Sequence, residues 1–267
     1  MQRILIFIVF ISIVLSGCRS EFEKIRTSNQ PELMLNKANE FYEKGEYANA
    51  QTLYELVIPY YRGKKEAEEL FYNFSYAHYY LGEYILASHY FNNFARTFYN
   101  SKWREEAAYM AAYSNLEMSP NHRLDQSHTQ KAIDEFQTFT NKFPESERIE
   151  ECNNIIDELR EKLEFKAFEQ GKLYYDLKNY NSCITSFDNM LKDFPESPNA
   201  EEVRFIILKS SFEWAENSIY TKKEERFRET IKRYNQFIRK YPSSKYASEV
   251  RAIKEQTEEA LKNYTDV

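Results

Sequence analysis

One pattern of side chains recurs along the chain and constrains its fold more than any other feature. A small residue, Ala132, is followed by Phe136, Phe139 and Phe143 at steps of four, three and four, which places all four on one stripe of an α-helix. Pro144 then ends this helix, because proline disfavours helical backbone in the residue before it. The same steps start at four other small or short side chains: Ala50, Ala87, Cys183 and Thr230. The pattern predicts five amphipathic helices that each bury an equivalent stripe.

Short signals around these stripes predict how the helices are connected. Gly45 and Gly82 each begin a Gly-Glu-Tyr step five residues before a stripe, so we expect a first helix, a tight turn and then the stripe helix. The last three stripes end in an aromatic-Pro step with a serine two residues later, and we expect this serine to cap the next helix. These serines are Ser146, Ser197 and Ser244.

The composition indicates an almost entirely helical chain. Its 267 residues include only 5 glycines and 7 prolines, 16% are aromatic, and no segment alternates as a β-strand does. The helix-turn-helix unit resembles the tetratricopeptide repeat, although the stripes here lie further apart than that repeat's usual period of about 34 residues. We therefore expect an all-α, right-handed superhelical array of about five such repeats. Repeats 1–3 would occupy residues 31–145, and repeats 4–5 with a C-terminal capping helix would occupy 146–267.

The N-terminus has the pattern of a bacterial lipoprotein signal. Arg3 precedes an apolar run over 4–14, which is too short to span a bilayer comfortably, and the run ends in the tetrad 15–18, Leu-Ser-Gly-Cys. This tetrad resembles a lipobox, which implies that residues 1–17 are a signal peptide and that Cys18 is acylated. Residues 18–30 would follow as a flexible tether. A simple signal peptide with an incidental cysteine is the alternative interpretation.

The charge and the motifs argue against several classes of function. The net charge of −6 argues against nucleic-acid binding. The sequence contains no nucleophile elbow, phosphate-binding glycine loop or dinucleotide fingerprint, so we expect no enzyme activity and no cofactor. The four histidines have no metal-ligand spacing, and we expect them at the surface or in a groove rather than at a metal: His78, His89, His122 and His128. We interpret Cys152 and Cys183 as packing residues, with a disulfide between them as the alternative.

Two groups of side chains are candidate binding surfaces. The first, on the predicted first helices of repeats 1 and 2, would form a groove for an extended peptide, because tyrosine is an amphipathic contact residue. It contains Asn36, Asn39, Tyr42, Tyr72, Tyr76 and Tyr79. The alternative is that these residues only pack repeats together.

The second group is basic and lies at the start of the fifth stripe helix. We expect it to meet an acidic partner surface, with an apolar centre supplied by Trp214, Tyr220 and Phe227. It contains Lys222, Lys223, Arg226, Arg228, Lys232 and Arg233. A solvated helix face is the alternative.

The lipobox, the tether and the five repeats together resemble the BamD family of outer-membrane β-barrel assembly lipoproteins. Two segments carry the more specific likeness: 124–132, LDQSHTQKA, and 161–175, EKLEFKAFEQGKLYY. The resemblance implies a non-catalytic scaffold, anchored to the outer membrane by lipid and facing the periplasm. Its C-terminal repeats would bind a BamA-like barrel subunit, and its N-terminal repeats would meet unfolded outer-membrane proteins. Glu201 and Glu202 depart from the basic contact that the family leads us to expect.

Two other functions suit the same repeats. One is that of another envelope tetratricopeptide lipoprotein that coordinates cell-wall synthesis or division. The other is that of a surface nutrient-binding lipoprotein, for which the chain is short.

Overall fold

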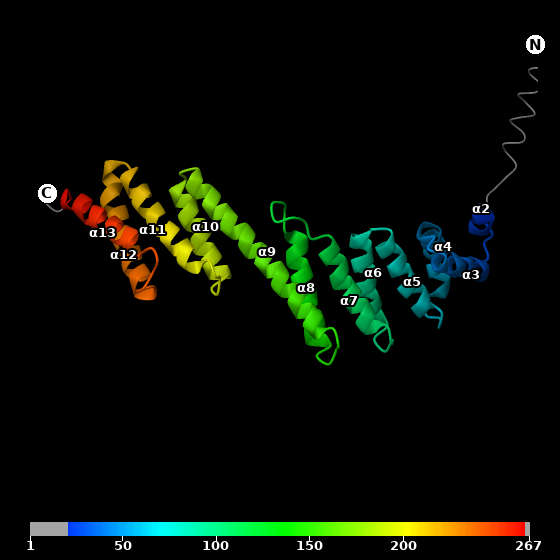
Figure 1. Ribbon diagram of the computed structural model, residues 1–267. Coiled ribbons are helices and arrows are strands. Elements are labelled where there is room, and N and C mark those ends of the chain that lie inside the picture. The colour runs from blue at the N-terminus through cyan, green and yellow to red at the C-terminus, as the bar shows by residue number, and fades with distance from the viewer. Residues whose placement is uncertain (1–20, 265–267) are drawn as a thin grey trace, which may run out of the picture. The chain divides into compact units, whose positions relative to one another are not determined.

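The computed structural model describes residues 21–264, which form α-helices joined by short connections and contain no β-strand (Figure 1). Successive helices pack on one another from α2 to α8 and from α10 to α13, as expected for tandem helical hairpins. The helices are α2 (Glu21–Arg26), α3 (Pro31–Glu43), α4 (Tyr47–Tyr61), α5 (Ala67–Tyr80), α6 (Tyr84–Thr97), α7 (Arg104–Glu117), α8 (Ser127–Lys142), α9 (Ile149–Asp176), α10 (Tyr180–Asp193), α11 (Ala200–Glu216), α12 (Tyr220–Lys240) and α13 (Ala247–Lys262).

The chain forms two compact units. The first contains the residues up to Pro120 together with Asp125–Asp157, and the second contains Asn121–Leu124 together with the chain from Glu158 onward. Helix α9 contributes its first part to one unit and its second part to the other. The predicted boundary after residue 145 precedes this helix, whereas the change in packing occurs within it.

The repeated stripes form the core of both units, as predicted. The small residues Ala50, Ala87, Ala132, Cys183 and Thr230 are all fully buried, and the aromatic or apolar residues that follow them at steps of four and three are buried or half-buried. The tight turns before the first two stripes are also present, with Gly45 and Gly82 at φ of +76° and +75°. Only glycine adopts this left-handed backbone without strain.

Helix α9 packs against α10 at a glycine. A Cβ added to Gly171 would lie 2.3 Å from Cε1 of Phe187, and the ring of Phe187 is fully buried. The hydrophobic cluster around this contact includes Phe168 of α9 together with Cys183, Met190 and Val203. The packing of α9 on α10 therefore requires glycine at position 171, because a larger side chain there would collide with the Phe187 ring.

The predicted flexible tether over 18–30 is wrong for its described part. Residues Glu21–Arg26 form α2, whose Ile25 is buried and whose Phe22 ring lies 5.9 Å from that of Phe41. These two apolar side chains are three residues apart and so share one helix face, which packs on α3. Cys18 and the predicted signal peptide lie outside the described residues. Within the described range, no helix has the length and apolar character that crossing a membrane requires.

The serines after the aromatic-Pro steps do not cap the next helix in the predicted way. The N-cap residue of α11 is Asn199 and that of α13 is Tyr246, so each serine stands two residues too early. Instead, Ser197 Oγ accepts a hydrogen bond from the Asn199 amide at 3.1 Å, and Ser244 Oγ accepts one from the Tyr246 amide at 3.0 Å. The serines stabilise the turn before the helix.

The cysteines and one histidine are core residues. Cys152 and Cys183 are both buried free thiols, and burial raises the pKa of Cys152 to about 11. His78 is also buried, whereas we expected it at the surface or in a groove, and its Nδ1 lies 2.6 Å from Glu83 Oε2. The Glu83 carboxylate satisfies a ring nitrogen that helix packing removes from water.

Candidate protein-binding surfaces

The predicted tyrosines of the first unit lie in one continuous aromatic surface, defined here as Tyr42, Tyr47, Tyr72, Tyr76, Tyr79 and Tyr80 and called the tyrosine surface. Tyr80 joins its members: it stacks on Tyr47 with ring centroids 4.5 Å apart, on Tyr76 at 5.7 Å, and contacts Tyr42 at 6.5 Å. Tyr80 is 50% exposed, whereas the other five are half-buried. Sequence reasoning missed Tyr80, although it continues the four-residue steps of Tyr72 and Tyr76 on one helix face.

Tyr72 and Tyr76 also pack neighbouring repeats together. The ring of Tyr72 stacks on Trp103 at 4.9 Å, next to the start of α7, and the Tyr76 hydroxyl donates to Glu106 Oε1 of α7 at 2.7 Å. Burial first, and then the hydrogen bond to Glu106, raise the pKa of Tyr76, so its phenol remains a donor at neutral pH. Tyr72 and Tyr76 therefore pack neighbouring repeats together, which was the alternative interpretation. The exposed part of the tyrosine surface centres on Tyr80.

A charged pair borders this surface. Glu106 forms an ion pair with Arg148 at 2.5 Å, and the Arg148 guanidinium lies 4.1 Å from the ring centroid of Tyr109. The Tyr109 hydroxyl in turn donates to Glu151 Oε1 at 2.8 Å. Aromatic faces, phenols and a charged pair thus lie close together, which suits a peptide with mixed side chains.

The two asparagines predicted beside the tyrosines differ in their environment. Asn39 is half-buried, and its Oδ1 accepts a hydrogen bond from the buried Tyr54 hydroxyl at 2.7 Å. Asn36 is exposed. Asn39 therefore satisfies a core phenol, and Asn36 is the asparagine whose side chain is accessible to a ligand.

The predicted basic residues of α12 are paired within the chain to a large extent. Lys222 pairs with Glu225 at 2.9 Å, Arg228 with Glu224 at 2.8 Å, and Lys232 with Glu229 at 3.3 Å. Exposed pairs of this kind contribute only about 0–1 kcal/mol and exchange partners readily. Lys223 has no ion-pair partner among the residues that the structure describes.

The apolar centre expected beside these charges is largely covered. Phe227 is 1% exposed and belongs to the core, so it is not available to a partner. The Arg226 guanidinium lies 3.8 Å from the Trp214 ring centroid and donates to Ser218 Oγ, so it covers the indole. Tyr220, which is 68% exposed, is the accessible aromatic residue at this end of α12.

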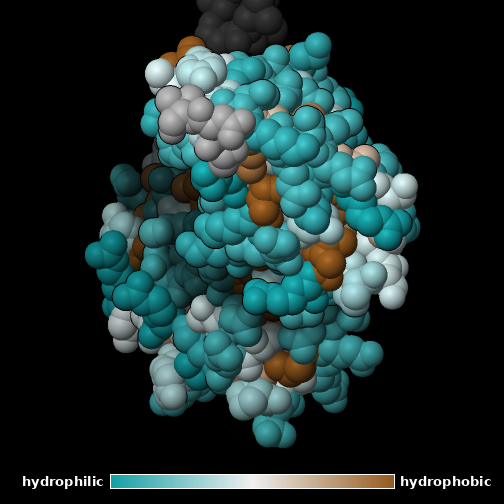
Figure 2. Space-filling view, turned by 90° about the vertical axis from the view of Figure 1, so that its left-hand side faces the viewer, coloured by the Kyte–Doolittle hydropathy of each residue, from teal (hydrophilic) through white to brown (hydrophobic). Residues whose placement is uncertain are grey.

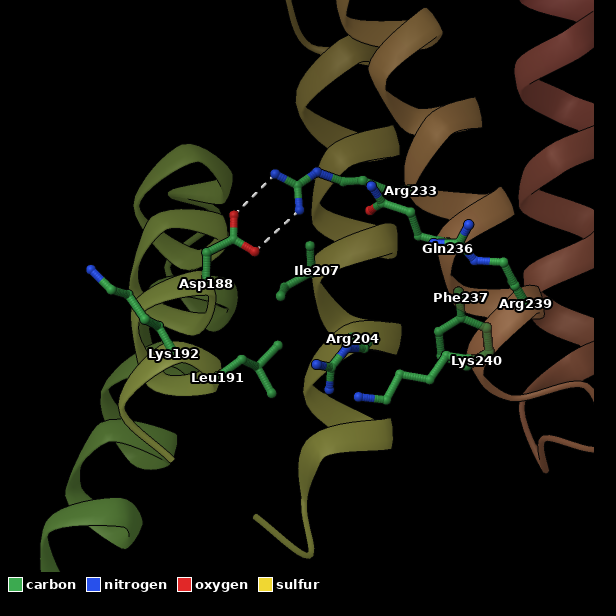
Figure 3. Close-up of a pocket in the computed structure, with 10 residues that line it drawn as sticks. All are labelled: Asp188, Leu191, Lys192, Arg204, Ile207, Arg233, Gln236, Phe237, Arg239 and Lys240. Atoms are coloured by element: carbon green, nitrogen blue, oxygen red, sulfur yellow. Dashed lines mark hydrogen bonds and ion pairs between the residues drawn. The ribbon is translucent and has the colours of Figure 1, made fainter. Parts of the chain in front are cut away.

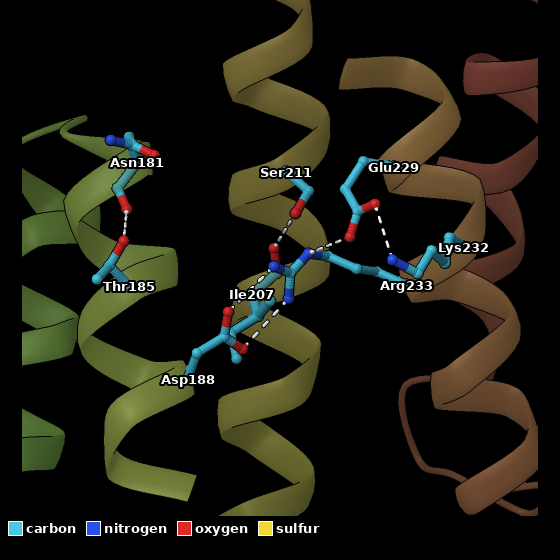
Figure 4. Close-up of polar contacts among 8 residues, drawn as sticks. All are labelled: Asn181, Thr185, Asp188, Ile207, Ser211, Glu229, Lys232 and Arg233. Atoms are coloured by element: carbon cyan, nitrogen blue, oxygen red, sulfur yellow. Dashed lines mark hydrogen bonds and ion pairs between the residues drawn. The ribbon is translucent and has the colours of Figure 1, made fainter. Parts of the chain in front are cut away.

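Arg233 connects two helices instead of facing solvent. Its guanidinium donates to both carboxylate oxygens of Asp188 of α10, at 3.2 and 3.0 Å, and lies 3.6 Å from Glu229 Oε1 of its own helix (Figure 4). Of the remaining predicted cations, Lys222, Arg228 and Lys232 are exposed, whereas Lys223 and Arg226 are half-buried. Their role in binding a partner stays a prediction.

The surface shown in Figure 2 has no large apolar patch. Hydrophilic residues cover most of this face, and hydrophobic residues show only as small, separate patches. A partner that docks here would rely on charge and hydrogen bonding as well as on local apolar contacts. Within residues 21–264, no group of three or more histidine, cysteine or acidic residues is placed to hold a metal ion.

Comparison with known families shows to which family the chain belongs. The model of the YfiO family, described as an outer membrane lipoprotein, matches residues 27–196 and 168–265. The chain belongs to this family. The YfiO match covers both units and all five stripes, and it supports a location in the cell envelope as a lipoprotein. No curated protein matches the chain.

Several solved structures are similar to this YfiO-family chain at low identity. A yeast Sti1 structure, titled as the TPR2AB-domain:pHSP90 complex, is 14% identical, and the match covers 86% of this chain and 99% of that one with a TM-score of 0.37. A tetratricopeptide repeat protein from Parabacteroides merdae is 17% identical, with coverage of 85% and 78% and a TM-score of 0.34. A Thermus thermophilus tetratricopeptide protein is 12% identical, with coverage of 85% and 98% and a TM-score of 0.32.

Proposed function

We propose that this protein is a non-catalytic scaffold of outer-membrane β-barrel assembly, anchored by lipid at Cys18 and facing the periplasm. The observation that carries the proposal is the match to the outer membrane lipoprotein family YfiO over residues 27–265, taken with the tandem helical hairpins. Hairpins of this type present extended surfaces for other proteins. The partners would be a BamA-like barrel subunit and unfolded outer-membrane proteins.

The two candidate surfaces are suited to these two kinds of partner. Unfolded barrel proteins expose aromatic and apolar side chains, for which the tyrosine surface offers stacking partners and phenol donors. A folded periplasmic module would be oriented by charge, and four cations of α12, of which Lys223 is half-buried and the others are exposed, would supply it: Lys222, Lys223, Arg228 and Lys232. Arg226 and Arg233 would act indirectly, since their guanidinium groups hold the fold around Trp214 and Asp188.

Co-purification of the full-length lipoprotein from membranes tests this function. We expect a β-barrel protein with periplasmic modules to be recovered with it in a stoichiometric amount. Replacing Lys222, Lys223 and Arg228 by glutamate should reduce that recovery most strongly at low salt, because complementary charge is screened as ionic strength rises. The matched control reverses two other exposed cations of the second unit, Lys245 and Arg251, and should leave recovery unchanged.

Two results would contradict the proposal. Recovery of cell-wall or division proteins without a barrel subunit would assign the chain to another envelope pathway. Full recovery by the charge-reversal variant, with unchanged salt dependence, would remove α12 as the contact surface.

A further inference from the structure

Two cavities in different units are built from equivalent positions of the repeat. The first groove, of about 320 Å³, lies among α6, α7 and α8, and the second groove, of about 680 Å³, lies among α10, α11 and α12. When the stripes are aligned on their small residues, Asn92 of the first groove corresponds to Asp188 of the second, and Glu135 corresponds to Arg233. Each groove can therefore be compared with the other position by position.

The corresponding positions form a polar bridge in both grooves. Asn92 Nδ2 donates to Glu135 Oε1 at 3.2 Å in the first groove. In the second, Arg233 donates two hydrogen bonds to Asp188, as Figure 3 shows. The residues differ, but the bridge joins the same two stripe helices of neighbouring repeats. The two grooves thus share the position of the bridge, while the side chains that form it differ.

Each groove carries two basic side chains at a second set of equivalent positions. These are Arg96 and Lys142 in the first groove, and Lys192 and Lys240 in the second. All four stand in the last turn of their helices. A cation in a last turn stabilises the helix dipole, which alone would explain them.

A third cation in each groove needs a different explanation. Arg104 is the first residue of α7, where the helix dipole disfavours a positive charge. Its guanidinium lies 3.9 Å from the ring centroid of Tyr99 and 5.2 Å from that of Phe143, which ends the third stripe, and its Nε donates to the Ala95 carbonyl oxygen at 3.3 Å. In the second groove Arg204, one helical turn further along α11, donates to the hydroxyl of Tyr241, the residue that corresponds to Phe143. The middle helix of both grooves therefore directs an arginine to the same place.

We call the three cations of each groove its basic triad: Arg96, Arg104 and Lys142 in the first groove, and Lys192, Arg204 and Lys240 in the second. The repeat does not require this triad in order to fold. Between the first and second stripes the corresponding positions hold Pro59 and Thr97, and the middle helix contributes Phe71, whose ring packs on Phe98 at 6.0 Å. The corresponding sequence positions of the third and fourth stripes hold Asn141 and Asp193. A repeat thus packs well without these cations, so their presence in two grooves points to a ligand.

The six triad cations have no carboxylate partner. No ion pair of the described residues includes Arg96, Arg104 or Lys142 of the first groove. The same is true of Lys192, Arg204 and Lys240 of the second. Most cations of α12 outside the groove are paired, as described above, so the triads differ from the charged surface around them.

Apolar side chains lie beside the cations. Ala95 and Phe143 are half-buried in the first groove, and Leu191 is half-buried in the second. In Figure 3, Ile207 lies between the Asp188–Arg233 pair and the end of Arg204, and Leu191 extends from α10 toward Arg204. A bare phosphate would use only the cations, whereas a peptide with acidic and apolar side chains would use both parts of the lining.

We propose that each groove binds an acidic peptide segment of a partner protein, with its carboxylates on the basic triad and an apolar side chain against Leu191 or Phe143. The chain would therefore hold two such segments. This inference goes beyond the proposed function and does not depend on the identity of the barrel subunit. The first groove belongs to the other unit, whereas the second shares α12 with the exposed cations that would orient that subunit.

Calorimetric titration of the detergent-solubilised full-length protein tests the proposal. The probe is a capped dodecapeptide of four Glu-Glu-Leu units, and two peptides should bind per chain at low salt. The variant Arg96→Gln/Lys142→Gln should bind one, and so should Lys192→Gln/Lys240→Gln. Because these side chains lie at the groove rims and make no hydrogen bond or ion pair within the described residues, folding should be unaffected. The affinity of the remaining site should change less than about twofold.

Matched controls separate groove binding from general charge attraction. Lys65→Gln/Arg251→Gln removes two exposed cations outside the grooves and should keep two sites. A peptide of Gln-Gln-Leu units should lose at least roughly tenfold in affinity, about 1.4 kcal/mol, and one of Glu-Glu-Ser units should also bind more weakly.

Several outcomes would overturn the proposal. One is the absence of binding by the Glu-Glu-Leu peptide, and another is equal binding by its glutamine counterpart. A third is an unchanged stoichiometry in both groove variants. A fourth is binding of inorganic phosphate or phosphatidylglycerol vesicles that the groove variants lose while peptide binding stays intact, which would assign the triads to phosphate groups.

Discussion

At Gly171, the packing of α9 on α10 leaves no room for a larger side chain. A methyl group there would meet the Phe187 ring at 2.3 Å, and that ring is enclosed on all sides by the second unit's core. Inserting a methyl group into a filled core typically costs about 1–3 kcal/mol. An alanine also gains up to about 1 kcal/mol of helix propensity over glycine, which offsets part of this cost.

We expect Gly171→Ala to lower the unfolding free energy of the second unit by about 1–2 kcal/mol, measured by denaturant unfolding. Phe187→Leu in the same chain should recover part of the loss, because the smaller side chain leaves room for the methyl group. Leu173→Ala, at a 56% exposed position of the same helix, is the matched control and should change stability little. A neutral or stabilising Gly171→Ala would show that the ring moves aside without cost.

At the same scale, the sequence predicted residues whose role is local and missed those whose role depends on tertiary contacts. The stripe residues were predicted correctly because helical periodicity alone determines which side chains share a face. His78 was expected at the surface or in a groove, because its sequence neighbours do not show that α5 buries it beside Glu83. Phe227 was assigned to a partner contact because one helix cannot show which of its faces meets α11.

At the scale of elements, the tyrosine surface separates into a packed part and an exposed part. Tyr72 and Tyr76 of α5 are held by Trp103 and Glu106, whereas Tyr80 extends to Tyr47 of the preceding hairpin and remains half-exposed. Sequence spacing grouped the tyrosines of α5 correctly. It could not separate these two parts, because the separation depends on which residues of α7 lie opposite.

Removing the exposed part should weaken binding without unfolding the repeat. We expect Tyr47→Ser/Tyr80→Ser to reduce the affinity for a urea-unfolded outer-membrane barrel protein by roughly tenfold, since each stacked aromatic contact contributes about 0.5–1.5 kcal/mol. Fluorescence anisotropy of the labelled barrel protein after dilution measures this affinity, and circular dichroism measures helix content, which should not change.

Tyr76→Phe is the control for the packed part. It removes only the hydroxyl that donates to Glu106, so it should cost about 1 kcal/mol of stability and leave binding intact. Loss of binding in Tyr76→Phe equal to that in the double variant would show that repeat packing, and not the exposed rings, determines affinity.

Helix boundaries were predictable where strong signals stand beside them, and α2 shows the limit. The turns at Gly45 and Gly82 lie where the sequence placed them, since a Gly-Glu-Tyr step marks each of them. Helix α2 has only six residues, too few for a periodic signal. It is stable because Phe22 and Ile25 pack on α3, a contact that no local pattern reveals.

At the scale of the whole molecule, the repeat explains which features the sequence could predict and which it could not. Equivalent positions could be aligned from the stripes alone, because each copy follows the same steps. The basic triads were nevertheless missed. Each combines side chains of three helices, and Arg204 stands one turn away from the position that matches Arg104. A site of this kind becomes visible only when the helices are placed together.

The last prediction concerns the proposed anchor at Cys18, on which the proposed location of the whole molecule depends. Several acyl chains on one cysteine, at about 0.8 kcal/mol per buried methylene, hold a protein on a membrane far more firmly than a single chain does. Cys18→Ala should therefore block acylation and leave the chain uncleaved or mislocalised, measured by metabolic labelling with a palmitate analogue and by membrane fractionation. Cys152→Ala is the matched control and should keep both label and location, because its thiol is buried in the first unit. Recovery of processed, membrane-bound protein from Cys18→Ala would show that the Leu-Ser-Gly-Cys tetrad does not act as a lipobox.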